Sequence, residues 1–306
     1  MRKLLLSLIA LGGIGLALFW GLTRPASVSD AEVAGLTGDP VAGEQIFWAA
    51  GCASCHAGAE AEGEARLILA GGQRFPSDFG TFHAPNISPH PDVGIGGWTL
   101  AEFTNALQNG VSPEGRHYYP AFPYTAYRLM ERQDIADLYA FMQTLPAVNT
   151  PSLPHEVGFP FSIRRLVGGW NLLFLNDDYV LQGDLSPEVE RGRYLSEALA
   201  HCAECHTPRN ALGALDTAAW MSGAPDFNGP GRVPALTPDE LDWSVRDIAA
   251  YLNDGFTPEF DAAGGHMVSV IRNMAMLPET DRLAIAEYLK ALPVPETPVA
   301  EDAPDY

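Results

Sequence analysis

The cysteines of this chain constrain its fold more than any other feature, because all four lie in two copies of one short pattern. Cys52-Ala53-Ser54-Cys55-His56 and Cys202-Ala203-Glu204-Cys205-His206 both read C-x-x-C-H. This pattern is the attachment signature of c-type haem: the two thiols bond the porphyrin and the histidine ligates the iron. We therefore expect two covalently attached haem c groups, held by Cys52, Cys55, Cys202 and Cys205, with His56 and His206 as axial ligands.

Two other uses of paired cysteines fit the sequence less well. Structural zinc motifs place their second ligand pair within about 12–20 residues of the first, whereas residues 56–201 separate these pairs. A disulfide within each C-x-x-C would close a tight, strained ring and would give no reason for a histidine in both copies. Haem attachment remains the interpretation that uses every residue of the pattern.

Aligning the two motifs exposes an internal repeat in which three helices recur in the same order. The first helix leads into each motif and begins with a cap and a first-turn proline, at Asp39-Pro40 and at Ser186-Pro187. We expect the cysteines to lie at the end of this helix in both halves.

The second and third helices repeat their caps and their apolar spacing. Thr99-x-x-Glu102 and Ser244-x-x-Asp247 predict capping boxes, and Gly110 and Gly255 predict the ends of the same helices. The third helix has an i, i+3, i+4, i+7 apolar face in both copies, at 138–145 and 285–292, and each ends at Leu-Pro. No stretch alternates as a strand does, so the predicted fold class is all-α.

The N-terminal segment predicts attachment to a membrane. Leu4 to Leu22 carry no charge and follow Arg2 and Lys3, which matches a span of about 20 apolar residues with its N-terminus in the cytoplasm. Ser27-Val28-Ser29 offers the alternative of a cleaved signal peptide. Either way the body is exported, and the anchor interpretation predicts a protein of the inner (cytoplasmic) membrane with its body in the periplasm.

The formal net charge of −20, from 38 acidic and 18 basic residues, argues against nucleic acid or anionic lipid as a partner of the body. It is explained either by solubility outside the cell or by an acidic docking face for a basic protein.

The residue on the far side of each iron decides between an electron carrier and a catalyst, because a methionine thioether fills the site whereas an open site binds ligands. In the second half we expect Met267, within Gly264-Gly265-His266-Met267, with Met276 as its competitor. The corresponding first-half stretch, 118–124, has no methionine. There Met130 is the expected ligand and His117 the alternative.

The residues quoted so far, with others, resemble the dihaem cytochrome c group that includes the cytochrome subunits of membrane-bound alcohol and gluconate dehydrogenases. The resemblance is carried by 83–89, 94–98, 119–124, 201–210, 265–267 and 281–286, and it covers nearly the whole chain after the N-terminal segment. Those subunits have a methionine that matches Met267. This chain lacks their third haem motif, and Phe122 stands where many of them have a methionine.

The resemblance implies two tandem class I-like cytochrome c domains behind a transmembrane helix. The expected division is 1–30 for the anchor or signal, 31–150 and 185–294 for the two domains, 151–184 for an ordered linker and 295–306 for a disordered tail. It also implies a periplasmic carrier of single electrons that accepts them from a dehydrogenase and passes them to quinone or a terminal oxidase.

Two further functions are open on the sequence alone. One is a dihaem enzyme, such as a peroxidase or a thiosulfate-oxidising protein, that uses the irregular first haem as its reactive centre. The other is an anchored assembly subunit that holds a soluble dehydrogenase at the membrane.

Overall fold

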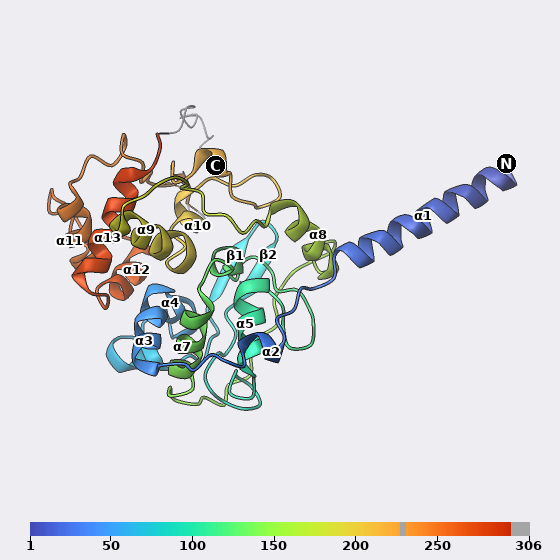
Figure 1. The fold of residues 1–306 in the computed structure, drawn as a ribbon, viewed down its shortest axis with the longest axis horizontal. Coiled ribbons are helices and arrows are strands. Elements are labelled where there is room, and N and C mark those ends of the chain that lie inside the picture. The colour runs from blue at the N-terminus through green and yellow to red at the C-terminus, as the bar shows by residue number, and fades with distance from the viewer. Residues whose placement is uncertain (227–230, 295–306) are drawn as a thin grey trace.

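A computed structural model describes residues 1–226 and 231–294 of the chain. The expected disordered tail, 295–306, lies outside the described residues. The described chain forms a mostly helical body, from which one long N-terminal helix projects (Figure 1). The expectation of a mainly helical protein is therefore confirmed.

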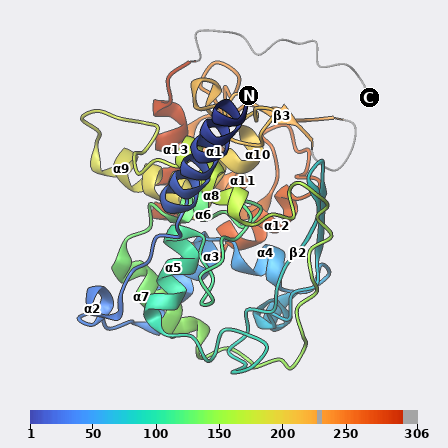
Figure 2. The ribbon, with the colours of Figure 1, turned by 90° about the vertical axis from the view of Figure 1, so that its right-hand side faces the viewer.

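The projecting helix is α1 (Arg2–Leu22), and none of its residues is buried. It leaves the body at its C-terminal end and points away from it (Figure 1), so that it lies in front of the body when the molecule is turned by 90° (Figure 2). Among the described residues it is the helix that is long and apolar enough to cross a membrane, with a mean hydropathy of 2.1.

The body contains a similar series of elements in each half. The first half holds α2 (Asp30–Val33), α3 (Pro40–Ala49), α4 (Cys52–His56), η1 (Gly63–Leu67), α5 (Leu100–Asn109), α6 (Tyr124–Tyr127) and α7 (Arg132–Met142). The second half holds α9 (Pro187–Arg193), η2 (Tyr194–Leu199), α10 (Ala203–His206), η3 (Thr217–Ala219), α11 (Val245–Asp254), α12 (Met267–Met274) and α13 (Glu279–Ala291).

The repeated helices begin and end at the predicted caps. The side chains of Asp39 and Ser186 accept backbone N–H groups at the starts of α3 and α9. Capping boxes start α5 and α11, whose ends at Gly110 and Gly255 are left-handed, with φ of 59° and 77°. Local sequence signals therefore determine the boundaries of these helices.

One close helix crossing occurs in both halves and depends on a glycine. A Cβ atom at Gly43 of α3 would lie 2.0 Å from the carbonyl oxygen of Asp137 in α7, and one at Gly192 of α9 would lie 1.9 Å from that of Ala284 in α13. Only a residue without a side chain lets the two backbones approach this closely. The same crossing brings the first and third helices of each half together.

The second half carries one extra residue between this glycine and its motif, and a turn of π-helix accommodates it. In the first half Ala50 N donates to Ile46 O, an i to i−4 bond, whereas in the second half Ala200 N donates to Leu195 O, an i to i−5 bond. The wider turn keeps both ends of the helical segment in register with the first half. Single-residue insertions of this kind often lie at functional sites.

The fold departs from the all-α expectation in two short hairpins. Strand β1 (Arg74–Ser77) pairs with β2 (Gly80–His83), and β3 (Ala224–Pro225) pairs with β4 (Arg232–Val233), both antiparallel. These strands have two to four residues, and two of them contain proline, so they have no room for an alternating pattern. Their pairing depends on the surrounding loops.

The segment between the halves contains α8 (Arg165–Phe174), which lies beside the end of α1 (Figure 1). Earlier in the segment Glu156 pairs with Thr81 through two backbone hydrogen bonds of 2.9 and 3.1 Å. Near its end, Val180 N and Leu181 N donate to the buried carboxylate of Glu197. The segment thus contacts both halves, and one cluster of buried apolar side chains also runs through both of them.

Candidate haem sites

Both C-x-x-C-H motifs form a single helical turn at the same place in their half. Helix α4 follows Gly51, whose φ is 70°, and α10 follows His201 and Cys202. His201 also has a positive φ, 43°. The left-handed residue reverses the chain at the end of the preceding helix, so each motif folds back against that helix.

The histidines of the two motifs make the same hydrogen bond. Nδ1 of His56 lies 2.8 Å from the carbonyl oxygen of Pro85, and Nδ1 of His206 lies 2.7 Å from that of Pro234. Burial lowers the pKa of both imidazoles, which keeps them neutral. A neutral ring that donates from Nδ1 to a carbonyl carries its lone pair on Nε2, the arrangement found in metal-ligating histidines.

A matching backbone frame holds each histidine in place. Gly71 N donates to the carbonyl of His56, and Gly223 N donates to the carbonyl of His206, both at 2.8 Å. The chain segments that provide the proline carbonyls are therefore tied to the motifs at two points. The same hydrogen bonds between residues far apart in sequence occur in both halves, so the two sites have the same local structure.

The four cysteines of the motifs are not paired with one another. All four lie within the described residues and none forms a disulfide. Burial raises the pKa of Cys52 and Cys202 to about 12 and that of Cys55 to about 11, and it also raises the pKa of Cys205. Cys205 is exposed and the other three are half-buried. The donor set of each motif, two thiols and one neutral imidazole, fits a covalently attached haem.

In the second half the expected distal ligand, Met267, is the first residue of α12 and is half-buried. Its competitor Met276 is 49% exposed beyond the end of that helix, and Met274 is buried in the core. The neighbouring His266 caps the start of α12 and is exposed.

In the first half Phe122 occupies the place that corresponds to Met267. Tyr118 N donates to Gly110 O at 2.7 Å, and Ala263 N donates to Gly255 O at 2.8 Å, so these two bonds align the halves. The same number of residues separates Tyr118 from Phe122 as separates Ala263 from Met267. The first half therefore has a phenylalanine at the structural position where the second half has Met267.

Met130, the expected first-half ligand, lies in the core just before α7 and is 3% exposed. The carbonyls of Asp137 and Ala284 face the crossing glycines of the two halves. Met130 precedes Asp137 by the same number of residues as Leu277 precedes Ala284. Leu277 is therefore its counterpart, and it too is buried. The first half thus places a thioether where the second half has an ordinary core leucine.

The alternative ligand, His117, is held elsewhere. Its Nε2 lies 3.0 Å from the carbonyl oxygen of Thr23, at the end of α1, and Arg164 donates to its backbone carbonyl. Burial lowers the pKa of this imidazole. These contacts favour Met130 over His117.

The two motifs meet at the contact between the halves. Oγ1 of Thr125, in α6, donates to Oε1 of Glu204 in the second motif at 2.6 Å. In the other direction, Nδ2 of Asn273, in α12, donates to Oγ of Ser54 in the first motif at 2.7 Å. Each motif is therefore hydrogen-bonded to a helix of the other half, the first motif to α12 and the second to α6.

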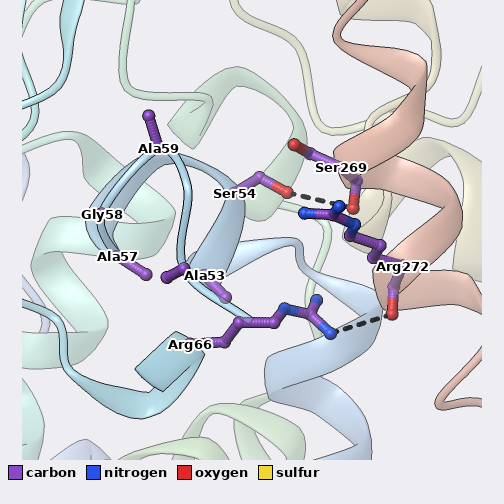
Figure 3. Close-up of a pocket in the computed structure, with 9 residues that line it drawn as sticks. Ala53, Ser54, Ala57, Gly58, Ala59, Arg66, Ser269 and Arg272 are labelled. Carbon is purple, nitrogen blue, oxygen red and sulfur yellow. Dashed lines mark hydrogen bonds between the residues drawn. The ribbon is translucent and has the colours of Figure 1, made fainter. Parts of the chain in front are cut away.

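Arginine side chains reinforce this contact around the first motif. Figure 3 shows Arg66 reaching across to the carbonyl of Arg272 in α12, a hydrogen bond of 3.1 Å, with Ser54 and Ser269 facing one another beside it. Arg66 also lies over the ring of Trp48, 4.4 Å from its centroid. The small cavity there is lined by residues of the motif and of α12.

Sequence reasoning did not find the proline carbonyls or the polar contacts between the halves. The carbonyls could have been found, because Pro85 and Pro234 follow their histidines by 29 and 28 residues, a further repeat. Thr125, Glu204 and Asn273 carried no signal, since their partners are distant in sequence.

Comparison with known proteins agrees with this geometry. The family model for cytochrome c matches residues 40–146. A protein of Cereibacter sphaeroides described as diheme cytochrome c-type is 55% identical over 97% of this chain and 100% of its own length. The fructose dehydrogenase cytochrome subunit of Gluconobacter japonicus is 37% identical, and the gluconate 2-dehydrogenase cytochrome c subunit of Pantoea cypripedii is 31% identical, each over 82% of this chain.

This chain spans the full length of the Cereibacter protein but only 52% and 58% of the two dehydrogenase subunits. The match to the Cereibacter protein covers nearly the whole chain. The chain therefore belongs to the dihaem c-type cytochromes, a family of electron-transfer proteins with covalently bound haem.

Proposed function

We propose that this chain carries two haem c groups and transfers single electrons in a periplasmic respiratory chain. The donor is a dehydrogenase and the acceptor is quinone or a terminal oxidase. Helix α1 anchors the protein in the inner membrane and keeps the body in the periplasm. The names of the dehydrogenase cytochrome subunits that resemble the chain support the choice of donor.

The observation that carries the proposal is the repeated histidine geometry. Two motifs of the same chain hold a neutral imidazole by the same Nδ1 bond to a proline carbonyl, at 2.8 and 2.7 Å. Bound haem would supply one-electron chemistry between ferric and ferrous iron. Each motif is hydrogen-bonded to a helix of the other half. This arrangement favours electron transfer from one haem to the other.

The residues of this chain would attach, orient and shield the two groups. Cys52 and Cys55, with Cys202 and Cys205, form the thioether bonds, and His56 and His206 are the proximal ligands. Met267 and Met130 are the proposed distal ligands, with Met130 favoured over His117 by the contacts that hold that histidine near α1. Buried aromatic side chains such as Tyr124 and Tyr127 exclude water, which raises the potential of an enclosed haem.

The same evidence favours two tandem domains, 31–150 and 185–294, joined by the ordered segment 151–184. Each proposed domain contains one glycine-mediated crossing, one capping box and one motif. The shared apolar cluster suggests that the two domains behave as one rigid unit in electron transfer.

The test compares the haem-loaded protein with two methionine variants of the first half. Met130→Leu removes the thioether but keeps the volume, and leucine is what the second half has at this place. Met142→Leu, a buried core position of α7, is the matched control. Haem content per chain is measured first by the pyridine haemochrome method, and two haems per chain are expected.

Magnetic circular dichroism then follows the near-infrared band of methionine-ligated ferric haem. Met130→Leu should lower its intensity by about half, because one of two thioether ligands is lost, whereas Met142→Leu should leave it unchanged. An unchanged band in Met130→Leu would mean that the first haem uses His117 or an open site. If the native protein then turned over peroxide or thiosulfate, the proposal of an electron carrier would be wrong and the protein would be an enzyme.

A further inference from the structure

The segment that contains α8 has an unusual surface for so acidic a protein. Residues 157–175 contain no aspartate or glutamate, although the chain has 38 of them. Large apolar side chains in this stretch point into solvent, among them Phe159, 84% exposed, and Leu173, 71% exposed. The remaining exposed apolar members are Phe161, Ile163, Leu166 and Leu172. Exposed apolar side chains gathered in one short segment are typical of a binding face.

Helix α8 exposes its leucines instead of burying them. Val167 and Gly168 face the protein, whereas Leu166 and Leu173, seven residues apart and so on the same side of the helix, face solvent. This is the reverse of a helix on the surface of a soluble protein, whose outer face is polar.

The helix is joined to the end of α1 at several points. The guanidinium of Arg165 lies 4.7 Å from the ring centroid of Trp20 and donates to the carbonyl of that residue. A Cβ at Gly168 would lie 2.7 Å from Thr23 O, and one at Gly169 would lie 3.3 Å from the ring of Phe19. The two glycines therefore let α8 cross closely over residues 19–23.

The position of this crossing follows from the length of α1. Its 21 residues span about 31 Å at 1.5 Å each, close to the ~30 Å hydrocarbon thickness of a bilayer. If α1 spans the membrane, residues 19–23 lie at its outer boundary. Tryptophan and arginine prefer this interface, and Trp20, Arg24, Arg165 and Trp170 all belong to α1, its end or α8. The exposed apolar face of α8 is therefore at the level of the lipid headgroups.

We propose that α8, together with the preceding loop 157–164, docks onto the outer surface of the lipid bilayer and inserts its exposed apolar side chains at the headgroup boundary. The absence of acidic residues suits contact with phosphate headgroups, and the apolar face suits the acyl chains beneath. This inference rests on the proposed role of α1 as an uncleaved anchor.

Such docking would fix the orientation of the whole body. Arg164 donates to His117 O at 3.0 Å and lies 3.9 Å from the ring centroid of Tyr119, which ties this segment to the first half. A single helical anchor would let the body rotate on its connection, whereas a second contact with the membrane restricts it. Trp170 Nε1, in α8, also donates to Leu212 O of the second half at 2.9 Å. The side of the body that carries α8 is therefore held next to the membrane, and the opposite side faces the periplasm.

The experiment uses the full-length, haem-loaded protein in nanodiscs of phosphatidylethanolamine and phosphatidylglycerol. The native cysteines are consumed by the haems, so a single introduced cysteine can carry a nitroxide spin label. Leu173→Cys reports on α8, and Leu11→Cys reports on the middle of α1. Phe260→Cys is the matched control, because Phe260 is also a large exposed apolar residue, 90% exposed, but lies after α11.

Collision rates with oxygen, which partitions into lipid, and with a water-soluble nickel chelate give the depth of each label. We expect the ratio of oxygen to nickel rates to be severalfold higher at 173 than at 260, and highest at 11. Adding Leu166→Asp and Leu172→Asp should lower the ratio at 173 and leave the ratio at 11 unchanged. Both leucines are exposed, so the haem spectrum should stay the same.

A label at 173 as accessible to nickel as the label at 260, with the label at 11 buried in lipid, overturns the docking and leaves the anchor in place. Loss of residue 11 from the purified protein, seen by mass spectrometry, removes the anchor and overturns the docking with it. A label at 173 that is shielded only when a dehydrogenase subunit is present would assign the face to a protein partner instead.

Discussion

Nδ2 of Asn273, in α12 of the second half, donates a 2.7 Å hydrogen bond to Oγ of Ser54 within the first C-x-x-C-H motif. Oδ1 of the same amide accepts from the guanidinium of Arg66. Asn273 is 1% exposed, so water does not compete for these bonds. The amide thus joins the first motif to the second half through a buried polar contact.

Replacing this amide should destabilise the protein. In Asn273→Ala the half-buried side chains of Ser54 and Arg66 lose a buried hydrogen-bond partner, and the free energy of unfolding should fall by about 1–3 kcal/mol. Urea unfolding of the haem-loaded protein measures this. Asn253→Ala, an exposed position of α11, is the control and should change stability by less than about 0.5 kcal/mol. Equal effects of the two substitutions would show that the contact contributes nothing.

The crossing glycines should tolerate no side chain. Gly43→Ala and Gly192→Ala each place a Cβ about 2 Å from a backbone carbonyl oxygen, and a backbone cannot move aside as a flexible side chain can. We expect each variant to lose about 1–3 kcal/mol or more of stability. Gly35→Ala, where no heavy atom lies within 4 Å, serves as the comparison and should unfold at the wild-type urea concentration.

These two positions also show which parts of the fold a sequence can predict. The repeated helices were predicted because their signals are local: Thr99 and Glu102 cap one end of a helix and Gly110 the other, all within one element. Position 43 requires glycine because the carbonyl of Asp137 lies against it. That residue comes nearly a hundred positions later, so no local sequence pattern predicts the contact. The hairpins were missed for the same reason, since a strand such as Arg74–Ser77 gains its pairing from a neighbour and not from its own composition.

The site divides in the same way. The cysteines and histidines of the motifs follow from their spacing alone, because attachment chemistry requires these residues to be adjacent. The proposed distal ligands Met130 and Met267 lie outside the motifs, at places that depend on the whole fold, so the spacing of the motifs does not identify them. The structure adds that Leu277 is its counterpart, a relationship that appears only when the helix crossings of the two halves are aligned.

The left-handed residue before each motif gives a third prediction. His201 has a φ of 43° where the first half has Gly51, and its ring lies 5.6 Å from the ring of Tyr127 in the other half. The side chain therefore offsets the cost of an unfavourable backbone conformation by contacts between the halves.

Two substitutions at this position separate those effects. His201→Ala and His201→Gly both remove the ring, but only glycine adopts a positive φ without a steric penalty. The glycine variant should therefore be more stable than the alanine variant by about 1 kcal/mol, measured by urea unfolding of the haem-loaded proteins. Gly51→Ala should show a loss of similar size. An alanine variant as stable as the glycine variant would mean that the backbone strain is absent.

The fourth prediction concerns the pH dependence of stability through His155. Burial, the guanidinium of Arg164 and the neighbouring His83 lower the pKa of His155 to about 4. In the unfolded chain a histidine has a pKa of about 6.5. The folded protein thus binds fewer protons at this residue between these two values. The free energy of unfolding therefore does not depend on the protonation of His155 above pH 6.5, and it decreases as the pH falls from 6.5 towards 4.

The variant His155→Asn tests this, because asparagine does not titrate and can still accept the 3.1 Å hydrogen bond that His83 N donates to Nδ1 of His155. The difference in unfolding free energy between wild type and variant should be constant above pH 6.5 and should shift in favour of the variant between pH 6.5 and 4. Other titrating groups are common to both proteins and cancel in the difference. A difference that does not change across this range would show that His155 has the same pKa in the folded and the unfolded chain. The lowering of its pKa by burial, Arg164 and His83 would then be wrong.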